Sequence, residues 1–179
     1  MVIWITGISG AGKTTLAQSL TRILKPRLPE LVLVDGDTIR DLFGTGLGFS
    51  EPERIVQIRR LQSLAKMLDE QGIVCVVAAL YAHPDLLAWN RENFRDYLEV
   101  YIEAPLSLVQ QRDAKGLYAA ARAGKMANMV GIDIPWHAPQ AADVVIDAAT
   151  GEPPERLARR VVQAHPRLAR VIAAEVVHE

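Results

Sequence analysis

The chain has 179 residues, half of them hydrophobic, and its 20 Lys and Arg residues against 21 Asp and Glu residues leave a formal net charge of −1. This length fits one α/β domain, and the near-zero charge disfavours a nucleic-acid coat or a polybasic membrane binder. No apolar run reaches the roughly 18 residues of a membrane span, and the first residues lack the layout of a signal peptide. We therefore expect a cytoplasmic protein whose partner is a small molecule rather than nucleic acid or a membrane.

Short apolar runs alternate with helical patterns along the chain. The predicted strands are Val2–Thr6, Leu31–Val34, Ile73–Leu80, Leu98–Ile102 and Val144–Ile146. Their continuous apolarity is typical of strands that are covered on both faces of a parallel sheet. The single cysteine, Cys75, excludes an intramolecular disulfide and lies inside the third of these runs. It is therefore predicted to be a buried small hydrophobic residue.

The helical patterns fill the intervals between the strands. The predicted helices are Lys13–Leu24, Thr38–Phe43, Pro52–Gln71, Pro84–Tyr97, Leu106–Arg112 and Pro154–Ala174. Ser50 is a candidate cap for the third helix, and Glu53 three residues later completes a capping box. The order predicts a three-layer α/β sandwich, one domain over residues 1–179, with a mostly parallel sheet of about five strands. Residues 113–139 show the least regularity, and a loop of this length is usually functional or mobile.

The most specific motif is G-x-x-x-x-G-K-[ST], which matches Gly7–Thr14 between the first strand and the first helix. Its glycines let the backbone wrap closely around phosphate oxygens, and the helix N-terminus presents partial positive charge to them. Lys13 reaches the β- and γ-phosphates in this motif, and the Thr14 hydroxyl binds Mg²⁺. ATP and Mg²⁺ are therefore the expected cofactors. The residues expected to hold the nucleotide here are Gly7, Ser9, Gly10, Ala11, Gly12, Lys13, Thr14 and Thr15.

Two carboxylates follow the second predicted strand, in the run Asp35-Gly36-Asp37. The carboxyl end of a strand faces the crevice in which α/β proteins bind ligands. Asp35 and Asp37 are thus candidates to hold Mg²⁺-bound water and to orient or deprotonate an attacking hydroxyl. Asp37 is also a candidate N-cap for the helix Thr38–Phe43, and the two roles are compatible.

Basic side chains follow at two places. Arg40 and Arg54 are candidates to bind an anionic substrate, because Arg54 lies in a first helical turn where a cation opposes the helix dipole. Residues 112–125 hold four basic residues against one acidic residue, Asp113. This glycine-punctuated segment is predicted to form part of a lid over residues 113–139 that closes on the phosphates and excludes water.

These motifs together resemble the adenylyl-sulfate kinase family of P-loop kinases. The resemblance extends over about residues 1–147. It rests on Gly7–Thr14, Asp35–Asp37 with Arg40, Gly48–Ser50 with Arg54, Ile58–Arg60, Arg112–Asp113 with Lys115–Tyr118, and Gly131–Asp133 with Pro135. It implies transfer of the γ-phosphoryl group of Mg·ATP to the ribose 3′-hydroxyl of adenylyl sulfate, which gives ADP and 3′-phosphoadenylyl sulfate and serves sulfate assimilation.

The resemblance also implies roles for single residues. Lys13, Asp35 and Asp37 would be catalytic, and Thr14 with Asp35 would hold the metal. Arg112 would join the nucleotide site. The acceptor would be bound by Asp37, Arg40, Phe49, Arg54, Gln57, Lys115, Leu117 and Met129.

Three positions depart from the family pattern, all on the acceptor side. Ala82 stands where some members carry a phosphorylatable serine, so that modification is excluded here. Gln57 replaces an asparagine, and Met129-Val130 replaces an aromatic residue followed by threonine. Methionine can pack on a ring, but it lacks the aromatic stacking that is worth roughly 0.5–1.5 kcal/mol.

These departures leave alternatives open for the acceptor. A relative that phosphorylates another modified nucleotide, such as cytidine diphosphoramidate in surface-polysaccharide modification, is the second hypothesis, and the stretch Trp89–Asn93 resembles that branch. A nucleotide-binding module without catalysis is the third, although its expected loss of Lys13 or of the carboxylates is not seen. A homodimer also remains open, because helix faces that dimerise cannot be told from core faces in the sequence.

Overall fold

The computed structural model describes residues 1–44, 46–113 and 116–173. Its centre is a sheet of five parallel strands in the order β2-β3-β1-β4-β5. The strands are β1 (Val2–Thr6), β2 (Val32–Asp35), β3 (Cys75–Ala79), β4 (Tyr97–Glu103) and β5 (Val144–Asp147). The predicted α/β fold class is confirmed, and every described strand lies within two residues of its predicted bounds.

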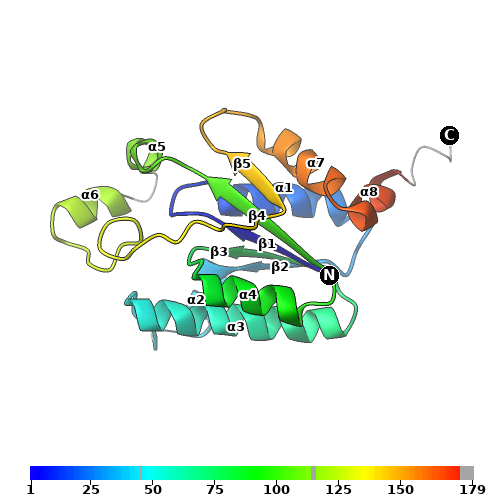
Figure 1. Ribbon diagram of the computed structural model, residues 1–179, viewed down its shortest axis with the longest axis horizontal. Helices are drawn as coiled ribbons and strands as arrows, with labels where there is room; N and C mark the ends of the chain where they lie inside the picture. Colours follow the sequence, from blue (N-terminus) through cyan, green and yellow to red (C-terminus); the bar gives the residue numbers. More distant parts are fainter. Residues whose placement is uncertain (45, 114–115, 174–179) are drawn as a thin grey trace.

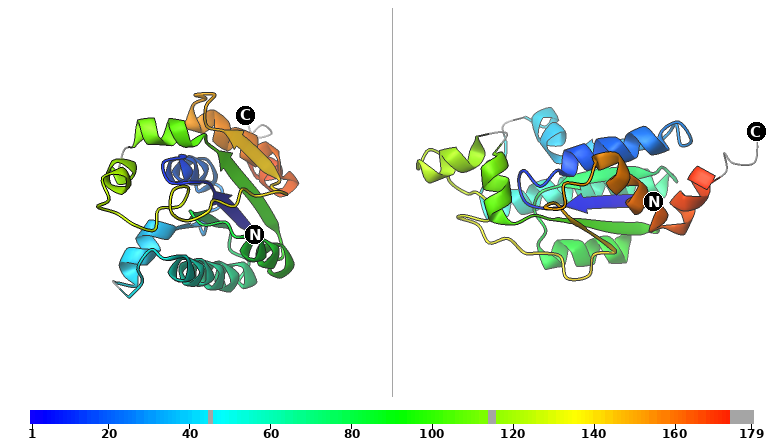
Figure 2. Two further views of the ribbon diagram at one scale, coloured as in Figure 1. Left: turned by 60° about the vertical axis from the view of Figure 1, so that its left-hand side comes forward. Right: turned by 90° about the horizontal axis from the view of Figure 1, so that it is seen from above.

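Helices cover both faces of the sheet (Figure 1). One face carries α1 (Lys13–Leu24), α7 (Pro154–Gln163) and α8 (Pro166–Ala173), and the other carries α2 (Gly36–Leu42), α3 (Glu51–Glu70) and α4 (Pro84–Asn93). Two short helices, α5 (Leu106–Arg112) and α6 (Leu117–Arg122), lie toward the end of the sheet at which the strands finish (Figure 2). Loops from both faces therefore meet at that edge.

The alternation of side chains along β1 divides the hydrophobic core into two clusters. Ile3 and Ile5 pack with α1 and α7, whereas Val2 and Trp4 pack with α3 and α4, and all four are fully buried. Successive residues of a strand point to opposite faces, so a central strand must be apolar throughout. Cys75 is buried in the second cluster as predicted, and burial raises the pKa of its thiol to about 12.

Two predicted helices end differently from the sequence expectation. The helix expected over Pro84–Tyr97 stops at Asn93, because Phe94 adopts an extended conformation and buries its ring beside Trp4. The helix expected over Pro154–Ala174 is two helices, α7 and α8. Proline has no N–H group to donate and disfavours helical geometry in the preceding residue, so Pro166 ends one helix and starts the next.

The start of α2 also differs from the prediction. The helix begins at Gly36 rather than Thr38, and its N-cap is Asp35 rather than Asp37. Asp35 Oδ1 accepts hydrogen bonds from the backbone N–H groups of Asp37 at 3.0 Å and Thr38 at 3.3 Å. A short carboxylate that reaches the second and third amides of a helix satisfies N–H groups that have no intrahelical partner.

The start of α3 is fixed by Glu53. Its carboxylate accepts from the backbone N–H of Ser50 at 3.0 Å and from that of Gly48 at 2.8 Å, which confirms the Glu53 half of the predicted capping box. A side chain at Gly48 would place its Cβ 2.7 Å from a Glu53 carboxylate oxygen, so the Glu53 carboxylate would have to move from its present position. The segment before α3 is thus held against the helix that it precedes.

Within the part of the chain that the structure describes, no helix is long and apolar enough to cross a membrane.

Candidate functional site

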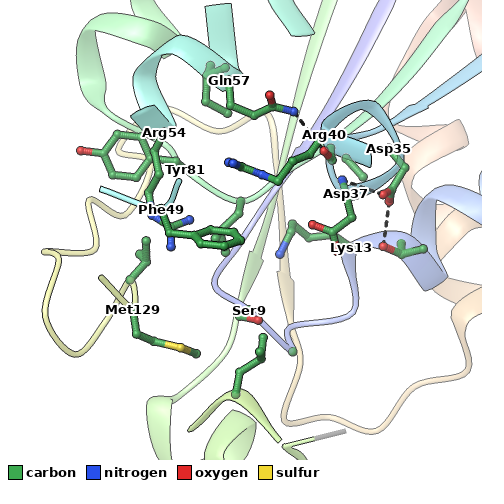
Figure 3. Close-up of a pocket in the computed structure, with 18 of the residues that line it drawn as sticks. Ser9, Lys13, Asp35, Asp37, Arg40, Phe49, Arg54, Gln57, Tyr81 and Met129 are labelled. Carbon is green, nitrogen blue, oxygen red and sulfur yellow. Dashed lines mark hydrogen bonds between the residues drawn. The ribbon is translucent and has the colours of Figure 1, made fainter. Parts of the chain in front are cut away.

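A large pocket opens at the carboxyl edge of the strands (Figure 3). It brings together most of the predicted site residues. Those that line it are Ser9, Gly10, Gly12, Lys13, Thr14, Thr15, Asp35, Asp37, Arg40, Phe49, Arg54, Gln57, Leu117 and Met129. Figure 3 shows Lys13, Asp35 and Asp37 toward one side of the pocket and Arg54, Phe49, Tyr81 and Met129 toward the other. The pocket therefore has one side at the loop between β1 and α1, where the sequence predicts phosphate binding, and an opposite side that is more apolar and cationic.

The loop between β1 and α1 forms one side of the pocket. We name it the phosphate loop, after the role that the sequence predicts for it. Gly10 has a φ of +78°, which glycine adopts without the strain that a side chain would bring. Gly7 lies below the loop, where a Cβ would approach the Ile102 carbonyl oxygen to 2.7 Å. Lys13 Nζ donates to the carbonyl oxygen of Ile8 at 2.9 Å, so the ammonium group is folded back over the loop that carries it.

The carboxylates lie where β2 and α2 meet, next to this loop. Thr14 Oγ1 donates to Asp35 Oδ2 at 2.9 Å. Asp35 thus uses one oxygen for the Thr14 hydroxyl and the other for the amides of α2. A hydroxyl and a carboxylate are oxygen ligands of the kind that Mg²⁺ prefers beside phosphates, so the residues present fit this metal.

On the opposite side of the pocket, Arg40 and Phe49 form one wall. Arg40 Nη1 donates to the carbonyl oxygens of Leu47 at 3.2 Å and Gly48 at 2.8 Å, and its guanidinium carbon lies 4.7 Å from the centre of the Phe49 ring. The ring itself is 44% exposed. Arg40 therefore holds the segment that presents an aromatic face to the pocket.

Arg54 connects this wall to the segment that follows α6. Its Nη2 donates to the Asn128 carbonyl oxygen at 2.7 Å, and its guanidinium carbon lies 5.6 Å from the Phe49 ring centre. The side chain is only 7% exposed, and its Nε has no hydrogen-bond partner among the described residues. Burial, and then the charge of Arg40, lowers the pKa of Arg54. Two adjacent cations, one buried with an unsatisfied donor, favour binding of an anion.

Gln57 lies one turn further along α3 and is 5% exposed. Its Nε2 donates to the Gly36 carbonyl oxygen at 3.1 Å, and this bond fixes the orientation of the amide. Its Oε1 is buried without a hydrogen-bond partner among the described residues. The amide therefore offers the pocket an acceptor that a ligand N–H or O–H group can satisfy.

A second, smaller pocket adjoins the phosphate loop on the side of β5. Ala11, Gly12 and Thr15 line it, together with Arg112, whose Nη2 donates to the Ala148 carbonyl oxygen at 2.9 Å. Ala11 and Arg112 thus lie outside the large pocket, and Gly7 lines neither pocket. Lys115 lies outside the described residues.

Two tyrosines were missed by the sequence reasoning. Tyr81 follows the carboxyl end of β3, lines the large pocket and donates its hydroxyl to the Glu51 carboxylate. Burial, and then that hydrogen bond, raises the pKa of Tyr81. Its place just after a buried strand was a usable signal, because ligands bind beyond the carboxyl ends of parallel strands. Tyr118 lines the same pocket from α6; it ends the Lys115–Tyr118 stretch on which the resemblance rests, but the sequence analysis gave it no role.

Comparison with known proteins connects this geometry to a family. The chain matches the family described as "Adenylylsulphate kinase" over residues 1–147. The chain belongs to the adenylylsulphate kinase family. A Synechocystis relative named "Probable adenylyl-sulfate kinase" is 38% identical over 144 residues, which make up 80% of this chain and 81% of that protein. A Chloroflexus aurantiacus relative named "Adenylyl-sulfate kinase" is 40% identical over 144 residues, or 80% of this chain and 77% of that protein.

A solved structure gives the same assignment. It is the structure of the Mycobacterium tuberculosis APS kinase CysC in complex with AMPPNP and APS. It superposes with a TM-score of 0.84 at 32% identity, and the match covers 91% of this chain and 95% of that one. The adenylylsulphate kinase family thus accounts for the fold as well as the motifs. The match to the family ends at residue 147, which is also the last residue of β5, so α7 and α8 lie beyond it.

Proposed function

We propose that this protein transfers the γ-phosphoryl group of ATP to the ribose 3′-hydroxyl of adenylyl sulfate, giving ADP and 3′-phosphoadenylyl sulfate. The observation that carries the proposal is one pocket with two complementary halves. Lys13 and the phosphate loop form one half, and an aromatic face with two arginines forms the other. Asp37, on α2, lines the same pocket on the side of Lys13 and Asp35.

ATP would occupy the half formed by the loop between β1 and α1. The backbone N–H groups and Lys13 would bind the β- and γ-phosphates, and the nucleoside would extend toward the second pocket and Arg112. Thr14 and Asp35 would hold Mg²⁺, which neutralises phosphate charge when it is bound. Leu117 and Met129, from the segment proposed as the lid, line the pocket and would help to exclude water.

The acceptor would occupy the opposite half. Its base would lie on the Phe49 ring, with Met129 nearby, and its sulfate and phosphate groups would meet Arg40 and Arg54. Gln57 Oε1 would accept a hydrogen bond from the acceptor. Asp37 would orient the ribose hydroxyl and accept its proton as the phosphorus–oxygen bond forms.

The direct test is ADP release with defined acceptors. Purified protein with ATP and Mg²⁺ should release ADP when adenylyl sulfate is added, and the nucleotide product should carry a new 3′-phosphate. Cytidine diphosphoramidate is the matched alternative acceptor, because the three family departures all lie on the acceptor side. ADP release with the cytidine compound but not with adenylyl sulfate would contradict the proposed acceptor while leaving the phosphoryl transfer intact.

The two roles proposed for Asp35 can be separated by two substitutions. Asp35→Ser keeps an oxygen that can cap α2 but removes the carboxylate, so we expect about 10- to 100-fold weaker Mg²⁺ activation. Asp35→Ala removes both functions and should additionally lower stability by about 1 kcal/mol. Activity at varied Mg²⁺ and thermal unfolding measure the two effects. An unchanged Mg²⁺ dependence in Asp35→Ser would contradict the metal role.

A further inference from the structure

Tyr118 makes a contact to which neither the motif that contains it, Lys115–Tyr118, nor the proposed chemistry assigns a role. It is the second residue of α6, and its side chain is 1% exposed. Its hydroxyl donates to the Ser9 carbonyl oxygen at 2.9 Å, across 109 residues of sequence. The bond therefore joins the helix after α5 to the backbone of the phosphate-binding loop.

The position of the tyrosine is fixed from both ends. At the backbone, the Asp113 carboxylate accepts from the N–H of Tyr118 at 3.1 Å and from that of Ala119 at 2.9 Å. At the ring, Tyr118 belongs to the cluster that includes Ile8, Ala11 and Val109. The backbone and the ring of Tyr118 are thus both held in place. Little conformational entropy is therefore lost when its hydroxyl forms the hydrogen bond to Ser9.

Burial raises the pKa of Tyr118 to about 12, with a further contribution from the Asp113 charge. The phenol is therefore protonated at neutral pH and acts as a donor to the carbonyl.

The consequence for the loop follows from peptide geometry. In a planar trans peptide the carbonyl oxygen of one residue and the N–H group of the next point in opposite directions. A donor that holds the Ser9 carbonyl oxygen therefore also fixes the direction of the Gly10 N–H group, away from Tyr118. This matters at Gly10 because the residue has a φ of +78° and no side chain that limits its rotation.

We propose that Tyr118 is a positioning residue, which orients the Ser9–Gly10 peptide so that the Gly10 N–H group is directed to the phosphates of ATP. This proposal rests on the proposed function, because it assigns the phosphate loop to the nucleotide donor. Preorganised N–H groups stabilise charge that develops in a transition state without reorganising at that moment. The hydroxyl of Tyr118 would therefore act on turnover through the loop, without touching the substrate.

The test variant is Tyr118→Phe, which removes the hydroxyl and keeps the ring. We expect kcat to fall about 3- to 10-fold, as for the loss of one hydrogen bond, with the KM for the acceptor unchanged. The shift of the Gly10 amide resonance that an ATP analogue induces, measured by NMR, should become smaller in Tyr118→Phe. An unchanged kcat or an unchanged Gly10 shift would each overturn the proposal.

The matched control is Tyr97→Phe. Tyr97 also has a partly buried hydroxyl, which donates to Glu99 and accepts from Asn90, but it lies at the start of β4, away from the phosphate loop. Equal losses of kcat in Tyr118→Phe and Tyr97→Phe would show a general effect of lowered stability and would overturn the proposal. Should Tyr118→Phe fail to fold, Asp113→Asn weakens the anchor of α6 and must still reduce the Gly10 shift that the ATP analogue induces; an unchanged shift would equally overturn it.

Failure of this proposal can be told from failure of the proposed function. Wild-type protein that gives no ADP with adenylyl sulfate would contradict the acceptor. The Gly10 shift induced by an ATP analogue would still test Tyr118, because it needs no acceptor.

Discussion

Replacing Lys13 with alanine is expected to lower acceptor-dependent turnover by about 10²- to 10³-fold. The Lys13 ammonium group lies over the phosphate loop, held by the Ile8 carbonyl oxygen at 2.9 Å. In the proposed reaction it would supply a positive charge at the point where phosphate charge redistributes during transfer. Initial rates of ADP release at saturating ATP and acceptor measure the effect on chemistry, and titration with an ATP analogue measures the effect on binding.

The control for this substitution is Lys25→Ala. Lys25 Nζ also donates to a backbone carbonyl oxygen, that of Leu31 at 2.7 Å, but it follows the carboxyl end of α1 and lines neither pocket. Lys25→Ala should therefore stay within about twofold of the wild-type rate. Turnover that survives the loss of Lys13 would show that the loop does not catalyse phosphoryl transfer, and would favour a module that only binds nucleotide.

Asp37→Asn is expected to cut turnover by about 10²- to 10⁴-fold while ATP binding stays nearly unchanged. The amide has the shape of the carboxylate but cannot accept the proton of the acceptor hydroxyl. Because Asp37 is the second residue of α2 and the cap of that helix is Asp35, the substitution leaves the capping hydrogen bonds in place. Single-turnover product formation and ATP affinity together separate the chemical role from a binding role.

Asp41→Asn is the matched control, since Asp41 is on the same helix, is exposed, and does not line the pocket. Its turnover should equal that of the wild type. The alternative role for Asp37, positioning of the metal, makes a different prediction: excess Mg²⁺ would restore part of the lost rate. Full activity in Asp37→Asn would remove both roles.

The sequence was most informative where a motif dictates backbone geometry. The glycines and Lys13 of the phosphate loop could be placed because strand, loop and helix are consecutive and their spacing is fixed. The bounds of α1 and α5 were predicted for the same reason, since start and stop signals lie within a few residues of each end.

Features that depend on contacts between distant segments could not be predicted in this way. The choice of Asp35 over Asp37 as the cap of α2 depends on the direction in which β2 leaves the sheet, and this also brings Asp35 to Thr14. The bond from Arg54 to Asn128 spans 74 residues, and that from Tyr118 to Ser9 spans 109. Local patterns contain no information on such pairs, so Arg54 could be suspected only from its unfavourable place in a first turn and from the resemblance to the family.

The division of the core into two clusters has a consequence for how such an enzyme can change its substrate. Helices α2, α3 and α4, with Arg40, Arg54 and Gln57, rest on the cluster around Trp4, whereas the phosphate loop and α1 rest on the cluster around Ile5. The sheet separates the two, so substitutions on α3 that reshape the proposed acceptor side can accumulate without disturbing the packing beneath the phosphate loop. Of the three family departures, Gln57 and Ala82 lie on the Trp4 side, whereas Met129 belongs to the cluster around Ile5, so the first two follow this partition and the third does not. Directed evolution toward a new acceptor nucleotide would therefore begin most safely on the face of α3.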